Sequence, residues 1–373
     1  MRCNALLLIA PYDCNKNFDQ TMTAIYFQDS RNDLDQWQGL LMSVQITRKP
    51  ALILQSGRGC RTKLSVGGQT LFWAEIADGY SGVNLWRTLP HSADVALLPH
   101  IHSSQIQAQK HLPPLERRQY WAKWFARGLM ESPHTPLAQG LWALEYSDRD
   151  DERTYTPHRG LQRHWRNLYN DKRQAAEFFG APLCYIDWAM CGNGSIIPLF
   201  AAPFDLSVDA AESGRVKYWC KVAREMQATD QGGTLPPLLL WFMSGLDAFV
   251  LLDGHDRLYA SLLTGIEPEY LILDSYTERA RVLDETRQNA IHKQLNILEQ
   301  KIAEGTAIKP ELILSVQKYL AHSYDDRPVR IERTRASLSL DPEQWQKEVD
   351  AYEKQLKSQQ PHQALEWFYV DDV

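Results

Sequence analysis

Short apolar runs separated by polar breaks dominate the first hundred positions of the chain. Several runs alternate apolar and polar residues or are rich in β-branched and aromatic residues, and glycine, asparagine and aspartate lie between them. This pattern predicts β-strands, because successive side chains of a strand point to opposite faces of a sheet. A hairpin turn is expected at Gly67-Gly68. The expected strands are 6–9, 23–27, 41–47, 51–54, 63–66, 70–76 and 95–98.

The spacing of apolar residues changes near Pro113. From there they recur three or four positions apart, which is the period of an α-helix. Asn193-Gly194 lies between two further apolar runs and is typical of a β-hairpin. The polar stretch 147–156 predicts an exposed loop and a candidate domain boundary. The expected elements are helices at 115–130, 160–179 and 208–227 and strands at 184–190 and 196–201.

The third part of the chain begins with continuous apolar runs, which are typical of strands covered on both faces. They predict strands at 238–242, 248–252 and 270–273, with helices at 257–263, 277–304, 310–322 and 342–356. An α+β fold is therefore expected. Its predicted parts are a strand-rich region over 1–150, an α/β core over 151–275 and a mainly helical region over 276–373.

Composition narrows the functional classes. The net charge is -6 at pH 7, whereas a generic nucleic-acid binder carries a basic surplus, so nucleic acid is not expected as a partner. The 6 cysteines form no Cys-x-x-Cys pair, which favours a reducing compartment. The apolar segment 5–10 is short for a signal peptide and is predicted as a strand, and no run approaches the ~18 apolar residues of a membrane helix. We therefore expect a soluble, cytoplasmic protein without a membrane partner.

The candidate chemistry lies in Asp253-Gly254-His255-Asp256-Arg257, between an apolar run and a predicted helix. A strand–glycine–helix turn directs free backbone N–H groups and the positive end of the helix dipole toward one point, which suits a phosphate. Gly254 lets a ligand approach the backbone. Arg257 supplies a planar charged donor, and His255 exchanges protons near neutral pH.

The same turn has a purely structural interpretation. Asp253 or Asp256 would cap the helix through its carboxylate. Arg257 would pair with a nearby acid such as Asp247 or Asp274. The residue types alone leave both interpretations open.

Two other patterns are weaker. Four histidines lie between 91 and 111, but only His100 and His102 form a close pair, whereas a metal site usually needs three or four convergent ligands. Polar loop histidines and no metal site are expected. The stretch 56–59 lacks the Gly-Lys-Ser/Thr ending of a phosphate loop and is predicted to be a tight turn.

The stretch LPPLLLWFMSGLDAFVLLDGHDRLYASLLTGIEPEYLILD, residues 235–274, resembles the core of the ParB/sulfiredoxin-like superfamily. It contains, in order, a strand after a proline, a short hairpin, a strand ending in a Gly-x-x-Arg turn, a helix, a glycine-bounded turn and a last strand. Residues 222–233 resemble the helix and loop that come before. The resemblance implies a ParB/sulfiredoxin-like α/β core that carries a phosphate-binding turn.

In members of this superfamily the turn contacts the phosphates of ATP, ADP or CTP. By position, Gly254 and Arg257 match the shared glycine and arginine, and Ala260 matches the small residue of the following helix. The most similar local form is the Asp-Gly-His-x-Arg turn of the ParB-like free-serine kinases. Asp253 and His255 complete the match to that form.

Three departures from the family pattern limit what the resemblance implies. Sulfiredoxins carry a reactive cysteine where this chain has His255, which argues against sulfinic-acid reductase activity. ParB partition proteins carry arginines at the places of Asp256 and Tyr259, and an acid there would repel phosphate. The family's upstream catalytic glutamate has no anchored match, although Glu212 and Glu225 lie in the right region.

From these features we expect binding of a nucleotide or another phosphorylated small molecule, which phosphotransfer or nucleotide hydrolysis could follow. Gly254, Asp256 and Arg257 are the expected ligand-binding residues. His255 and Asp253 are the expected catalytic residues, which move a proton or orient Mg²⁺.

Two other functions remain open. The main alternative is a non-catalytic binding protein, such as a bacterial immunity protein that neutralises a toxin through a degenerate ParB-like scaffold. The acidic composition and the large flanks outside the resemblance favour it. A nuclease is a weaker third option, because the sequence shows no cluster of metal-binding carboxylates.

Overall fold

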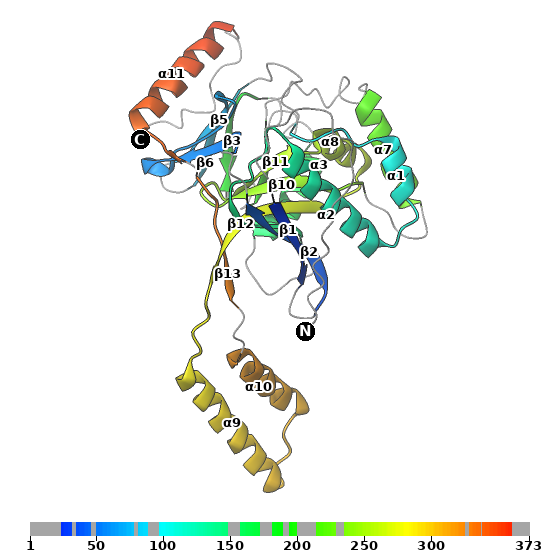
Figure 1. Cartoon of the computed structure of the whole chain (residues 1–373), viewed down its shortest axis with the longest axis vertical. Helices are drawn as coiled ribbons and strands as arrows, with labels where there is room; N and C mark the ends of the chain where they lie inside the picture. The colour runs from blue at the N-terminus through cyan, green and yellow to red at the C-terminus, as the bar shows by residue number, and fades with distance from the viewer. Residues whose placement is uncertain are drawn as a thin grey trace.

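The chain folds around two β-sheets with helices beside them (Figure 1). The structure is a computed structural model, and both helices and strands contribute to it, so the expected α+β class is confirmed. It describes residues 24–31, 35–45, 50–77, 81–88, 97–147, 157–171, 181–188, 194–199, 214–228, 235–324, 328–336 and 338–359.

The larger sheet has the strand order β1-β2-β7-β12-β10-β11-β9, and β13 pairs with β12. Its strands are β1 (Ala24–Arg31), β2 (Trp37–Gln45), β7 (Gly140–Tyr146), β9 (Ser195–Pro198), β10 (Leu238–Met243), β11 (Ala248–Asp253), β12 (Tyr270–Arg279) and β13 (Val329–Glu332). The pairs β10–β12 and β9–β11 are parallel. The hairpin pair β10–β11 is antiparallel, as the sequence analysis expected.

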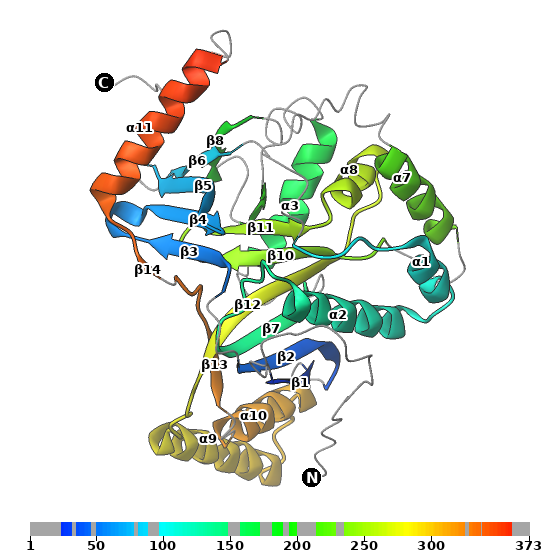
Figure 2. The same ribbon diagram turned by 45° about the horizontal axis from the view of Figure 1, so that its top comes forward.

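Helices lie beside the larger sheet, and Figure 2 shows α1, α2, α7 and α8 grouped next to its strands. On β2, every second residue is buried, namely Leu40, Met42 and Val44, and α2 contacts this strand. On α2, Phe125 and Leu129 are buried four residues apart, as on one face of a helix. The buried face of β2 and the buried face of α2 therefore belong to one core. The helices are α1 (Ser103–Gln109), α2 (Pro114–Glu131), α3 (Pro157–Asn170), α7 (Gly214–Gln227) and α8 (His255–Thr264).

The smaller sheet has the order β14-β3-β4-β5-β6-β8. Helix α11 (Pro342–Gln359) packs against it, because the buried Trp345 donates to Thr62 O at 3.0 Å and lies edge-on to Trp86. Lys63 and Glu348 form an ion pair at 2.5 Å across the same contact. The C-terminal helix thus completes the packing of N-terminal strands. The sheet comprises β3 (Leu52–Ser56), β4 (Thr62–Val66), β5 (Gln69–Ile76), β6 (Gly82–Arg87), β8 (Leu183–Asp187) and β14 (Leu338–Ser339).

Two helices form a hairpin that stands away from both sheets (Figure 1). They are α9 (Glu285–Ala303) and α10 (Pro310–Ser323), and they connect β12 to β13. Ile291, Leu298 and Val316 form an apolar cluster of their own within this hairpin, separate from the main core. The hairpin is therefore packed independently of the sheets.

Several expectations about single elements are wrong. The hairpin expected at Gly67-Gly68 is confirmed, because this pair joins the antiparallel strands β4 and β5. The hairpin expected at Asn193-Gly194 is wrong, because β8 lies in the smaller sheet and β9 in the larger one. The expected helix at 277–304 begins as the end of β12. Of the expected strand at 95–98, residues 95 and 96 lie outside the described residues, and Leu97 and Leu98 form a bend. The sequence analysis missed β6, β7, β13, β14 and α1.

The expected boundaries between regions of the chain, at 150 and 275, do not separate the larger sheet from the smaller one. Strand β7, from the first region, lies between β2 and β12 in the larger sheet. The order of elements expected over 222–274 is nevertheless present, from α7 through β10, β11 and α8 to β12. The expected strand at 6–9 and the stretch 148–156 lie outside the described residues. None of the helices described combines the length and the apolar composition that crossing a bilayer requires.

Candidate functional site

The turn between β11 and α8 is the centre of the candidate site. Gly254 has φ 107° and ψ 21°, in the left-handed region that favours glycine. A Cβ atom there would lie 2.7 Å from Leu238 Cδ2 and 2.9 Å from Arg257 Nη2, so the turn also requires glycine for space. No side chain described caps the first turn of α8. The backbone N–H groups at the start of this ten-residue helix are therefore not used by a cap.

The guanidinium of Arg257 points back to the strand and not toward solvent. Its Nη2 donates to Asp253 Oδ2 at 2.6 Å and to Pro237 O at 3.1 Å. The side chain is only 4% exposed, and its Cζ lies 5.6 Å from the ring centre of Trp219 and 5.9 Å from that of Phe125. Arg257 therefore joins β11, α2 and α7, and the expectation that it contacts a phosphate directly does not fit this position.

Asp256 is also held by an arginine. Arg215 Nε on α7 lies 2.7 Å from Asp256 Oδ2, and Arg215 Nη1 lies 3.1 Å from His100 Nδ1. The side chain of Arg215 is 57% exposed, so it is the more accessible of the two arginines at the turn. Asp256 does not bind the helix N-terminus, and the expectation that Asp253 or Asp256 is the cap is wrong.

His255 is the first residue of α8 and is half-buried. Burial lowers the pKa of its imidazole below the usual 6.5, although the charges of Asp253 and Asp256 oppose the shift. The ring is therefore neutral at pH 7. Its Nε2 is buried and has no hydrogen-bond partner among the described residues. A neutral imidazole with a free nitrogen can accept a proton or donate one hydrogen bond to a ligand.

Two residues that the sequence analysis did not select lie behind the turn. Tyr259 is 1% exposed, and burial raises the pKa of its hydroxyl. Arg87, at the end of β6, is fully buried and donates to Ala181 O at 2.6 Å. The charge of Arg87 acts on both Tyr259 and His255. This cation comes from the smaller sheet, which no local pattern around 253–257 could indicate.

The carboxylates once considered as partners of Arg257 lie elsewhere. Asp247 is in the β10–β11 turn at φ 45°. Asp274 lies on β12, where burial and the charges of Glu332 and Glu145 raise its pKa, and Arg330 pairs with Glu145 at 2.8 Å. Arg257 therefore pairs with an acid, as the structural interpretation expected, but that acid is Asp253 and not Asp247 or Asp274.

Mg²⁺ does not fit the side chains at the turn. It is usually bound by one or two carboxylates together with substrate phosphates. Here Asp253 and Asp256 are each occupied by an arginine. Within the described ranges, no group of three or more His, Cys, Asp or Glu side chains could hold a metal ion.

The remaining candidates have structural positions. His102 precedes α1 and forms a capping box with Gln105. The stretch 56–59 leads into a short 3-10 turn at Arg58–Cys60. A cavity of about 590 Å³ beside it is lined by Arg58, Gly59, Arg61, Glu75, Ile76, Ala77, Asn84 and Pro342. Glu225 pairs with Lys110 at 3.4 Å, and Glu212 lies outside the described residues.

Comparison of the chain with protein-family models, with curated proteins and with solved structures gave no match.

Proposed function

We propose that the turn between β11 and α8 binds the phosphate of a nucleotide or of another phosphorylated small molecule. The observation that carries the proposal is the start of α8, where a left-handed glycine precedes backbone N–H groups that no described side chain caps. The buried, unpartnered Nε2 of His255 in the same turn supports it. Together they offer hydrogen-bond donors and a positive helix end to an anion.

The proposal assigns different roles to the two arginines. Arg257 fixes the turn through Asp253 and Pro237, which keeps the amides in place. Arg215 is exposed and is the cation that can move from Asp256 to a bound phosphate. Gly254 and Asp256 line the same turn. ATP, ADP and CTP are the nucleotides that the resemblance to the ParB/sulfiredoxin-like superfamily suggests.

Phosphotransfer or nucleotide hydrolysis is the reaction that fits this arrangement. His255 acts as a base, because its lowered pKa leaves the imidazole neutral at pH 7. Asp253 orients the turn through its pair with Arg257. Backbone amides stabilise the charge on the transferred phosphoryl group.

The test is a thermal-shift and calorimetric titration with ATP, ADP and CTP, with and without Mg²⁺. A ligand that binds only the folded chain raises the melting temperature by mass action. We expect His255→Gln and Arg215→Gln to weaken binding by about tenfold each, the loss of one good hydrogen bond, with an unchanged melting temperature in the absence of ligand. Lys221→Gln, also on α7 and 75% exposed, is the matched control. If none of the three nucleotides shifts the melting temperature, the assignment of ATP, ADP or CTP as the ligand is wrong.

A specific observation favours a second function, that of a binding protein without turnover. Both acids of the turn are neutralised internally, Asp253 by Arg257 and Asp256 by Arg215. A degenerate scaffold would show such pairing, and an immunity protein that binds a toxin is the candidate. In a toxin-neutralisation assay, a variant carrying His255→Gln and Arg215→Gln would remain protective. Loss of protection would contradict this second function.

A further inference from the structure

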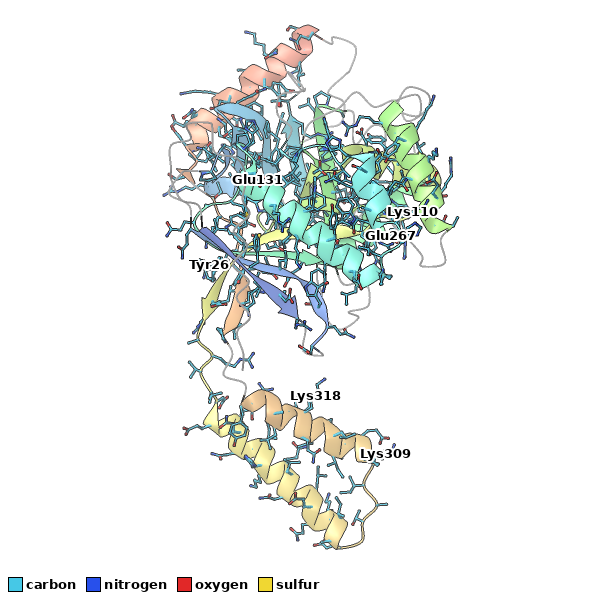
Figure 3. The ribbon with its side chains drawn as sticks, turned by 45° about the vertical axis from the view of Figure 1, so that its right-hand side comes forward. Tyr26, Lys110, Glu131, Glu267, Lys309 and Lys318 are labelled. Atoms are coloured by element: carbon cyan, nitrogen blue, oxygen red, sulfur yellow. The ribbon has the colours of Figure 1, made fainter. Side chains whose placement is uncertain are left out.

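The hairpin of α9 and α10 exposes large apolar side chains. Ile297 is 46% exposed, Leu312 45% and Tyr319 58%. Leu312 and Tyr319 are seven residues apart, so they lie on one face of α10. Figure 3 shows the hairpin apart from the sheets, with Lys309 and Lys318 on it. The apolar face is therefore presented to solvent and not to the body of the same chain.

The hairpin has little interior of its own. Its cluster has three buried side chains, Ile291, Leu298 and Val316. Isolated short helices are marginal in water, and small units need further burial to be stable. An additional packing partner would cover the apolar face and stabilise both helices.

We propose that this partner is the same hairpin of a second copy of the chain, and that the two hairpins pack as a four-helix bundle about a two-fold axis. Helix α9 has 19 residues and is therefore ~28 Å long. Helix α10 has 14 residues and is ~21 Å long, so two helices side by side at a spacing of about 10 Å offer a face of about 500 Å². Two such faces bury about 1,000 Å², which is about the smallest area expected of a specific interface.

The charges of the hairpin fit a second copy better than a strongly charged partner. Residues 285–324 contain five cations (Arg287, Lys293, Lys301, Lys309 and Lys318) and four anions (Glu285, Glu299, Glu304 and Glu311). Such a balance does not oppose self-association, whereas a nucleic acid would require a basic surplus. If two copies of α10 cross antiparallel near Ser315, Glu311 of each copy lies opposite Lys318 of the other. The flanks of the apolar face would then be complementary.

The test is sedimentation velocity of the full chain between about 1 and 100 µM, a range that detects association with a micromolar dissociation constant. The wild type should form dimers, and the double variant Leu312→Glu/Tyr319→Glu should raise the dissociation constant at least about 100-fold. The matched control is Asn289→Glu/Asn296→Glu, which adds the same charge seven residues apart at exposed positions of α9. The control should dimerise like the wild type.

A second measurement keeps the result independent of folding of the variant. Ser315→Cys, between Leu312 and Tyr319, should give a disulfide-linked dimer under mild oxidation beyond the wild-type background, and Asn296→Cys should not. A monomer at every concentration overturns the proposal and leaves the face to a different partner. Dimers that resist Leu312→Glu/Tyr319→Glu overturn it as well, because they would use another surface. Neither outcome depends on whether a nucleotide binds at the turn of α8.

Discussion

Replacing Arg257 separates a structural role from a ligand-binding role. In the structure its guanidinium is buried between Trp219 and Phe125 and pairs with Asp253. Arg257→Ala would remove that pair and leave the Asp253 carboxylate without its cation. It would also leave a cavity where α2, α7 and α8 meet. The first consequence is expected in stability, before any effect on ligand binding.

The size of the effect follows from burial. Removing one partner of a buried ion pair costs about 3–5 kcal/mol. The side chain of Asp253 retains 27% exposure, so water partly compensates its charge, and a loss of about 2–3 kcal/mol is expected. The matched control is Arg215→Ala, which removes the other arginine of the turn. Because Arg215 is 57% exposed, that change should cost about 0.5 kcal/mol or less.

Urea unfolding of the wild type, the two single variants, Asp253→Ala and the double variant Asp253→Ala/Arg257→Ala measures these values. The double-mutant cycle should give a coupling energy of about 1–3 kcal/mol between Asp253 and Arg257. The reasoning fails if Arg257→Ala unfolds at the urea midpoint of the wild type and only loses nucleotide binding. Arg257 would then be a ligand group, as the sequence pattern first indicated.

Three further outcomes are expected. Asp274→Asn should stabilise the chain at pH 8 but not at pH 4. Burial raises the pKa of Asp274, so the wild type loses stability as the pH rises through the folded pKa, by about 1.4 kcal/mol for each unit by which that pKa lies above the ordinary value. Urea unfolding at both pH values measures this difference. Trp345→Ala should cost about 3–5 kcal/mol, because a fully buried ring would be lost from the contact of α11 with the smaller sheet; equal unfolding midpoints would contradict that contact. Gly254→Ala should cost about 1–3 kcal/mol through strain at positive φ and the contact with Leu238, and a neutral result in the same assay would show that the turn relaxes.

Local patterns predicted the elements around the turn well. The apolar run 248–252 and the break at Gly254 correspond to β11 and to the left-handed start of α8. Periodicity also indicated α2 within one residue at each end. These features depend on side-chain alternation and backbone preference, which are properties of neighbouring residues.

Pairing across the chain could not be predicted in the same way. The sequence around 257 indicates that an arginine needs an acid, and the sequence analysis named Asp247 and Asp274 as examples. Only the placement of the strands shows that the partner is Asp253. Arg87 reaches the turn from the smaller sheet, more than 160 positions away in the sequence. The false hairpin at Asn193-Gly194 has the same cause, because two strands that are close in sequence joined different sheets.

The pairing at the turn changes what an anion would meet there. Arg257 with Asp253 and Arg215 with Asp256 cancel in charge, so these two pairs contribute little net field. What remains is the charge of the buried Arg87, which acts on His255, and the partial positive charge at the start of α8, about half an elementary charge, with backbone N–H groups fixed by the turn. Binding of a phosphate would therefore depend on the geometry of these amides and on His255, and the Asp253–Arg257 pair would act by holding that geometry. A scaffold without a ligand needs the same pair for stability, which is why variants of His255 and Arg215, and not of Arg257, distinguish the two functions.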